Sequence, residues 1–301
     1  MRVTLALPTT GEGAGPEAIG RAAELCQAAG IARVWSVDRL LKPVGKDAYI
    51  AEHYSITYDP IEALVWAAAH APEIELGTSV IVLPFQNPVA LARRVATLDR
   101  FAGGRLLLGL GAGHIPEEFA CVGVPRTERG RRLEEGIAVM RRVWGPDPVE
   151  FHGAFTDVAP SNIAPKPVRQ EGPRMILATM SEAATERAGR LGLGINPLIG
   201  DGSALASTVA VWSHALEAHG FDPGGLEVVV RTNRRVFDVG AAGPEGFGAW
   251  PRDRVIEDLR SLERAGATEV LYELHDPIRG IEEAIAEVAG IEGDLAGADG
   301  R

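Results

Sequence analysis

Residues 75–113, ELGTSVIVLPFQNPVALARRVATLDRFAGGRLLLGLGAG, contain the smallest unit that decides the fold. Two apolar runs, 75–82 and 105–110, enclose a stretch over 88–101 whose apolar residues recur with the period of a helix. Pro88 stands in the expected first helical turn, where its missing N–H costs nothing. Neither run alternates with polar residues, and strands of that kind are buried on both faces, as in a parallel sheet covered by helices. The stretch therefore predicts a strand–helix–strand unit of an α/β protein.

The same alternation runs through the chain. Strands are predicted over 3–7, 33–37, 75–82, 105–110, 175–178, 193–196, 227–232 and 269–274. Helices are predicted over 16–29, 60–71, 88–101, 128–144, 182–191, 204–219, 252–265 and 281–288. Eight such units without a break in composition predict a single (β/α)8 TIM barrel over residues 1–301, with insertion loops at the C-terminal mouth. A doubly wound open sheet is the alternative.

Composition narrows the class of partner. The chain has 301 residues and a net charge of -11, which disfavours nucleic acid and anionic membrane surfaces as partners and leaves small molecules. The opening MRVTLALPTTG does not resemble a secretory signal, and no apolar stretch reaches membrane length. Cys26 and Cys121 both lie among alanines and apolar residues of helical segments. We expect them to be core thiols of a cytoplasmic protein rather than a disulfide or a metal pair.

Two long segments interrupt the alternation. Residues 39–59 follow the second strand, and in a barrel such a loop lines the active site. Residues 145–173 follow a helix and contain a predicted hairpin, VEFHGAFTDV, and a proline-rich return, so their expected role is packing. The tail over 293–301 is small and polar, and we expect it to fray.

A glycine-rich string, GLGAGH, ends the fourth strand at residues 109–114. It lacks the third glycine of a dinucleotide fingerprint and comes after the wrong strand, so it is weak evidence for a Rossmann fold. Without Cβ atoms, these glycines would let a flat ring approach the backbone closely. A simple tight turn explains them equally well.

A longer pattern resembles a known family. The run LGTSVIVLPFQNPVALARRVATLDRFAGGRLLLGLGAGHIPEEFACVGVPRTERGRRLEEGIAVMRRVW, residues 76–144, resembles the signature stretch of the luciferase-like oxidoreductases. It is most similar in pattern to the branch that depends on coenzyme F420. The resemblance extends to RVWSVDR, VEFHGAFTDV and APKPVRQEGPRMILAT and covers most of residues 1–200. It implies a (β/α)8 barrel that binds F420 and a small organic substrate, commonly as a homodimer.

The resemblance also implies roles for residues at the ends of the second and third strands. Asp38 matches an acidic residue beside the cofactor ring. Ser79 and Val80 match a bulge behind the ring that contains a non-prolyl cis peptide bond, which we therefore predict here. Arg39 stands where relatives often have a histidine that serves as proton donor or stabiliser. The general acid is therefore open, and His114, whose imidazole titrates near neutral pH, is the candidate.

Two further strand ends complete the predicted site. Gly111, Gly113 and His114 match a loop that faces the ring edge, although many F420-dependent members have glutamate where this chain has His114. Thr179, Met180 and Ser181 match the place where relatives hold the cofactor phosphate, after the fifth strand. A helix start with hydroxyl groups is independently an anion site, although an ordinary serine N-cap explains Ser181 as well.

Other polar residues are given ordinary roles. Glu117 and Glu118 follow Pro116 in a first helical turn, where carboxylates complement the helix dipole. Arg129, Arg131 and Arg132 are expected on a solvated helix face, paired with Glu134 and Glu135. No metal site is expected. The ends of the last two strands carry polar residues that could touch substrate, namely Arg231, Asn233, Glu273 and His275.

The sequence leaves three functions open. F420-dependent hydride transfer is the first, and a monooxygenase that uses reduced FMN in the same pocket is the second. A barrel without cofactor or catalysis is the third, which the glycines and the Ser181 helix start disfavour. The anionic tail of F420 would need cations near the mouth, and Arg39, Lys42 and Lys46 on the long loop are candidates.

Overall fold

The computed structural model describes residues 1–45, 52–232, 252–273 and 281–298. Eight parallel strands follow one another around a barrel, and each predicted strand is present. In spatial order they are β10 (Val229–Arg231), β11 (Glu269–Glu273), β1 (Arg2–Ala6), β2 (Arg33–Ser36), β3 (Glu75–Thr78), β5 (Leu106–Gly111), β8 (Arg174–Thr179) and β9 (Gly194–Pro197). Single bridges from Ile195 to Val228 and from Leu198 to Arg231 join β9 to β10. The fold is thus a nearly closed TIM barrel, as the alternation predicted.

The third predicted strand is divided in two. β3 ends at Thr78, and a short strand β4 (Ile81–Val82) continues the pairing with β5. Between them, the peptide bond from Ser79 to Val80 is cis, which confirms the prediction. The chain therefore bulges where the strand reaches the barrel mouth.

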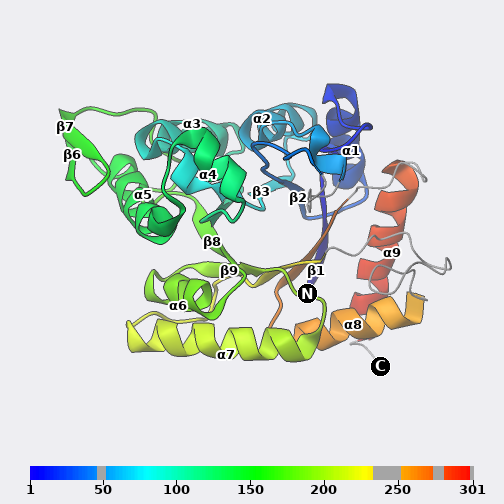
Figure 1. Cartoon of the computed structure of the whole chain (residues 1–301). Helices are drawn as coiled ribbons and strands as arrows, with labels where there is room; N and C mark the ends of the chain where they lie inside the picture. Colours follow the sequence, from blue (N-terminus) through cyan, green and yellow to red (C-terminus); the bar gives the residue numbers. More distant parts are fainter. Residues whose placement is uncertain (46–51, 233–251, 274–280, 299–301) are drawn as a thin grey trace.

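Helices cover the outside of the barrel (Figure 1). They are α1 (Pro16–Ala28), α2 (Pro60–His70), α3 (Pro88–Phe101), α4 (Pro116–Val122), α5 (Arg129–Trp144), α6 (Glu182–Arg190), α7 (Gly202–Ala218), α8 (Arg252–Arg264) and α9 (Ile281–Ala298). Short 3-10 turns are η1 (Glu52–Ser55), η2 (Leu83–Phe85) and η3 (Arg126–Glu128). Asp59 and Asn87 cap α2 and α3, each followed by a proline in the first turn, so that local sequence sets both starts.

Side chains fill the barrel interior in layers. At the bottom, Arg33 forms a buried ion pair with Glu269 and a partly buried one with Glu75. The middle layer is apolar and contains Trp35, whose ring occupies the space that a side chain at position 77 would need; Gly77 leaves it open. The indole N–H of Trp35 donates to Glu269 at 2.7 Å, which ties the two layers together. The upper layer is polar, and it forms the floor of the mouth.

Two predictions for single segments are wrong. Helix α9 continues to Ala298 through the tail that we expected to fray, because Ile291 and Leu295 are buried against the barrel.

The two cysteines differ in their surroundings. Cys26 is a core thiol, and burial raises its pKa to about 12. Cys121 instead lies exposed on the short helix α4. The predicted hairpin is present as β6 (Val149–His152) and β7 (Asp157–Ser161), which project beyond α5 (Figure 1).

Candidate functional site

The mouth of the barrel gathers the residues that follow β2, β3, β5, β8 and β10. Asp38 comes two residues after β2, and its Oδ2 accepts the backbone N–H of Val82 at 3.1 Å. Burial, partly offset by that hydrogen bond, raises the pKa of Asp38 to about 6. The carboxyl group therefore exchanges its proton close to neutral pH.

The bulge after β3 is held from two sides. The Ser79 hydroxyl donates to Oδ1 of Asn196 at 2.8 Å, and the Asn196 amide donates to the Val229 carbonyl at 2.7 Å. On the other side, the Ser79 N–H donates to the Ser36 carbonyl at 2.9 Å. Ser79 is almost fully buried, whereas Val80 is half-buried. Residues of three other strands, β2, β9 and β10, thus fix the bulge at the mouth.

The glycines of β5 have a packing role in this structure. A Cβ atom at Gly109 would overlap the carbonyl oxygen of Thr78. A Cβ at Gly111 would lie 2.6 Å from the Val80 side chain, and Gly113 needs its positive φ of 77°. The groups that approach these glycines closely are the backbone and side chains of the β3–β4 bulge, whereas the predicted approach of a flat ring stays a prediction. These glycines alone do not indicate a ring.

Arg39 points inward rather than to solvent. Its Nη1 lies 3.4 Å from Oε2 of Glu118, and its guanidinium carbon lies 4.9 Å from the centre of the Tyr54 ring. Glu118 also accepts the backbone N–H groups of Leu40 at 3.0 Å and Leu41 at 3.5 Å. This carboxylate is almost fully buried, so its role is to hold the start of the long loop. The ordinary helix-dipole role that we assigned to it is incomplete.

Fewer of the three predicted cations therefore lie exposed near the mouth, where they could bind the anionic tail of F420. Arg39 is only 13% exposed and is occupied by Glu118. Lys42 is partly buried on the described part of the loop, and Lys46 lies outside the described residues.

His114 lies exposed at the rim after β5. Partial desolvation, followed by the charges of Arg39, Arg126 and Arg231, lowers the pKa of its imidazole. The ring is therefore mostly neutral at pH 7 and suited to accept a proton or a hydrogen bond. The mouth therefore has two titratable groups whose pKa values are shifted in opposite directions. The pKa of Asp38 is raised, which favours its protonated form, and that of His114 is lowered, which favours its deprotonated form.

The end of β8 presents a buried hydroxyl without a partner. Thr179 is 4% exposed, and among the residues that the structure describes, its Oγ1 has no hydrogen-bond partner. Met180 is exposed beside it. Ser181 caps α6 by accepting the N–H of Ala184 at 3.4 Å, so the ordinary N-cap role is present. The unpaired Thr179 hydroxyl adds to it a group that a phosphate oxygen would satisfy.

Arg231, at the end of β10, is the most connected cation of the mouth. Its Nη1 donates to the Ser79 carbonyl and its Nη2 to the Tyr54 hydroxyl, each at 2.9 Å. Its Nε donates to buried Glu273 at the end of β11. The sequence indicated Arg231 and Glu273 only as possible substrate contacts and did not single out Tyr54. Asn233 and His275, named with them, lie outside the described residues.

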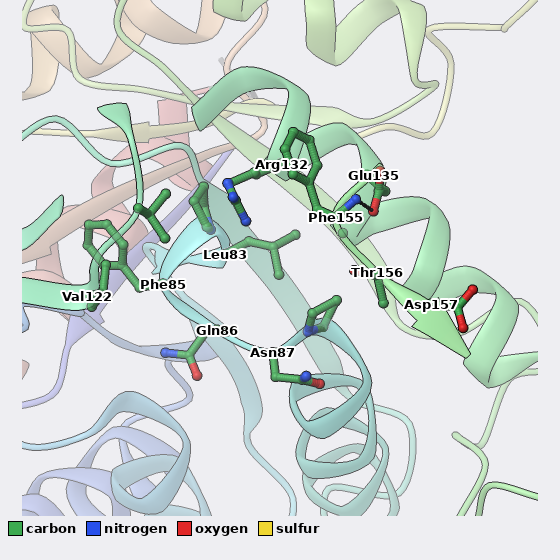
Figure 2. Close-up of a pocket in the computed structure, with 14 residues that line it drawn as sticks. Leu83, Phe85, Gln86, Asn87, Val122, Arg132, Glu135, Phe155, Thr156 and Asp157 are labelled. Carbon is green, nitrogen blue, oxygen red and sulfur yellow. Dashed lines mark hydrogen bonds between the residues drawn. The ribbon is translucent and has the colours of Figure 1, made fainter. Parts of the chain in front are cut away.

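A separate pocket of about 450 Å³ opens between η2, α4, α5 and the β6–β7 hairpin (Figure 2). None of the predicted site residues line it. At its rim, the Arg132 guanidinium lies 4.2 Å from the centre of the Phe155 ring and pairs with Glu128. Glu135 accepts the backbone N–H groups of Ala154 and Phe155, which holds the tip of the hairpin against α5. The predicted pairing of the α5 arginines with Glu134 and Glu135 is therefore wrong. Arg131 and Arg132 both pair with Glu128, and Glu134 pairs with Arg187 and Arg190 of α6.

Two features are absent from residues 1–45, 52–232, 252–273 and 281–298. No group of three His, Cys, Asp or Glu side chains there is arranged to hold a metal ion. No helix among them has the length and apolar character needed to cross a membrane.

Comparison with known proteins gives consistent results. A sequence model of the family described as luciferase-like monooxygenase matches residues 1–236. The 4-hydroxyprotoasukamycin monooxygenase of Streptomyces nodosus subsp. asukaensis is 29% identical over 184 residues, which are 58% of this chain and 49% of that protein. The chain spans between 49% and 61% of the length of such curated relatives.

Two solved structures share the fold. The coenzyme F420 dependent tetrahydromethanopterin reductase of Methanopyrus kandleri has a TM-score of 0.75 at 18% identity, with 96% of each chain covered. The oxygenating constituent of 3,6-diketocamphane monooxygenase from Pseudomonas putida, solved with FMN, has a TM-score of 0.80 at 17% identity. There, 99% of this chain and 98% of the other are covered. The fold is therefore found with either cofactor.

Proposed function

Because the chain belongs to the luciferase-like monooxygenase family, we propose that it is an oxidoreductase that uses coenzyme F420 to exchange a hydride with a small organic substrate. The observation that carries the cofactor site is the buried Thr179 hydroxyl just before α6, which has no hydrogen-bond partner among the described residues. Hydroxyl groups and free backbone N–H groups at such a helix start suit a ribityl phosphate. The choice of F420 rests on the run over residues 76–144, which resembles the F420-dependent branch.

Different residues of the mouth would bind different parts of the cofactor. Thr179, Met180 and Ser181 would hold the phosphate, and the bulge at Ser79 and Val80 would support the ring, with Gly111, Gly113 and His114 at its edge. When bound, F420 supplies a ring carbon that accepts or releases a hydride. The chain's own residues orient the substrate and limit the access of water.

Two of these residues can move protons. Asp38, with its pKa raised to about 6, can hold a proton near neutral pH at its carboxylate oxygens. His114, kept neutral by its lowered pKa, can accept one at a ring nitrogen. Arg39 replaces the histidine of many relatives. Because Glu118 holds it inward, we propose that it acts by orienting the loop rather than by giving up a proton.

A second candidate is a monooxygenase that uses reduced FMN. The 29% identity to a monooxygenase supports it, as does the inward position of Arg39, which removes one cation from the expected tail site. FMN has the same ring system and phosphate but lacks the anionic tail.

A binding titration separates these candidates. We expect the fluorescence of F420 to change when it binds. The Kd of F420 should be at least tenfold below that of FMN. Riboflavin, which lacks the phosphate, should bind more weakly than FMN if Thr179 and Ser181 hold that group. Tight FMN binding without F420 binding at low salt would reject the first proposal, and oxygenated product from reduced FMN would establish the second. We also propose a homodimer, which light scattering of the purified protein tests.

A further inference from the structure

Tyr54 is held over the mouth by backbone contacts. It lies on η1, within the long loop, and the residues that follow it pair with the loop after β1. The Tyr58 N–H donates to the Thr9 carbonyl at 2.9 Å, and the Gly11 N–H donates to the Ile56 carbonyl at 3.0 Å. The position of Tyr54 is therefore tied to the segment that follows β1.

Its hydroxyl oxygen is fixed by Arg231. One guanidinium donates to the Tyr54 oxygen and to the carbonyl oxygen of Ser79, each at 2.9 Å. Arg231 is itself oriented by Glu273. Because a guanidinium is planar and rigid, it sets the phenol at a defined place relative to the bulge. Since Arg231 is the donor in this contact, the phenol's own proton is directed elsewhere.

The electrostatics around Tyr54 suit a proton donor. Burial, followed by the charge of Glu273, raises the pKa of its phenol, so the side chain is neutral and protonated at pH 7. Two cations nevertheless lie beside it, Arg231 at the oxygen and Arg39 over the ring. A phenolate formed during a reaction would be stabilised by both.

We propose that Tyr54 is a catalytic residue whose hydroxyl hydrogen-bonds to a carbonyl or alcohol oxygen of the substrate, with Arg231 and Arg39 as its positioning residues. This inference rests on the proposed function and specifies the substrate class for the same site. Exposed apolar side chains follow three strands of the barrel at the mouth, Leu40 after β2, Met180 after β8 and Leu198 after β9. The substrate is accordingly an apolar ketone or the corresponding secondary alcohol.

The step balances with reduced deazaflavin as the two-electron donor. The reduced ring would supply the hydride by breaking one of its C–H bonds and would itself be oxidised by two electrons, while a new C–H bond forms at the carbonyl carbon and the C=O π bond breaks. The oxygen takes the Tyr54 proton and forms the O–H bond, which completes the alcohol. The phenolate that remains beside Arg231 and Arg39 regains its proton from water. Oxidation of the alcohol follows the same path in reverse.

Binding of matched probes to the F420-loaded protein tests this role. The probes are cyclohexanone and acetophenone, each compared with a hydrocarbon of the same shape, methylenecyclohexane or α-methylstyrene. We expect the wild type to prefer at least one ketone over its hydrocarbon. Tyr54→Phe should reduce that preference about tenfold, because one hydrogen bond is lost. The measurement is the ratio of the two Kd values, and turnover is not needed.

Tyr58→Phe is the matched control, because Tyr58 lies four residues further along the same loop and is exposed. It should leave the ratio unchanged. Equal preference in the wild type and Tyr54→Phe, or no preference in the wild type, overturns the role of Tyr54. The Kd of F420, measured first in every variant, separates the outcomes. If F420 does not bind, the proposed function fails, whereas normal F420 binding with an unchanged ratio rejects this inference alone.

Discussion

Replacing Asp38 by asparagine is expected to stabilise the protein at neutral pH. The ordinary pKa of an aspartate is about 3.9, whereas burial raises that of Asp38 to about 6 in the folded state. The folded state therefore binds this proton more tightly than the unfolded state does. Stability from this group is complete below about pH 4 and is lost as the pH rises through about 6. Asparagine carries no charge at any of these pH values and can still accept the Val82 N–H.

The magnitude follows from the two pKa values. Each pH unit between them corresponds to about 1.4 kcal/mol, so full burial would make the penalty about 3 kcal/mol. Asp38 is partly reached by solvent, and we therefore expect a gain of about 1 to 3 kcal/mol in the free energy of unfolding above pH 7. For a chain of this size, that corresponds to an increase in Tm of roughly 2 to 6 °C.

Thermal unfolding of the wild type and Asp38→Asn between pH 4 and pH 8 measures the effect. The difference in Tm should be small at pH 4, grow through pH 6 and remain constant above pH 7. Exposed Glu171→Gln is the control and should show no such trend. A Tm difference that does not depend on pH, or a less stable variant at pH 8, would refute the reasoning. A stabilised variant would indicate that the buried charge is kept for function.

Three further outcomes are expected. Gly109→Ala should destabilise the protein by roughly 3 kcal/mol or more in urea unfolding, because the new Cβ overlaps the Thr78 carbonyl. Gly13→Ala, where no atom lies within 4 Å of the new Cβ, should have little effect, and similar losses in both would contradict the packing role. Ser181→Asp should keep the N-cap and the Tm but strongly weaken cofactor binding in a titration, and unchanged affinity would reject the phosphate site. Exposed His152, hydrogen-bonded to two carboxylates, should titrate by NMR with a pKa above its ordinary value of about 6.5, and a lower value would show that these contacts do not persist.

The barrel could be predicted because its signals are local. Each strand is a continuous apolar run, and each helix has a 3.6-residue period with a proline or a capping residue at its start. Parallel strands place their carboxyl ends at one mouth, so the gathering of Asp38, Ser79 and Thr179 follows from the order of elements alone. The break at Ser79 and Val80 came instead from the family resemblance.

The contacts that complete the mouth could not be predicted in this way. Arg231 and Tyr54 are 177 residues apart in the chain, and Arg39 and Glu118 are 79 apart. Neither pair has a spacing that any local pattern records. Glu118 has the sequence context of an ordinary first-turn carboxylate, and only the packing of the long loop over α4 buries it. Side-chain direction and burial at a barrel mouth depend on loops, which hydrophobic periodicity does not describe.

Because the Trp35 ring fills the space above Gly77, the residue that each of these two positions can accept depends on the residue at the other. An alanine at position 77 is incompatible with the indole, and a smaller residue at position 35 leaves a void in the barrel centre and removes the indole hydrogen bond to Glu269 below it. Either substitution alone destabilises the barrel. Positions 35 and 77 can therefore change only together. Among diverging descendants of this chain, loops at the mouth are therefore free to change substrate while this pair stays fixed. Directed evolution of new activities should leave positions 35 and 77 out of its libraries.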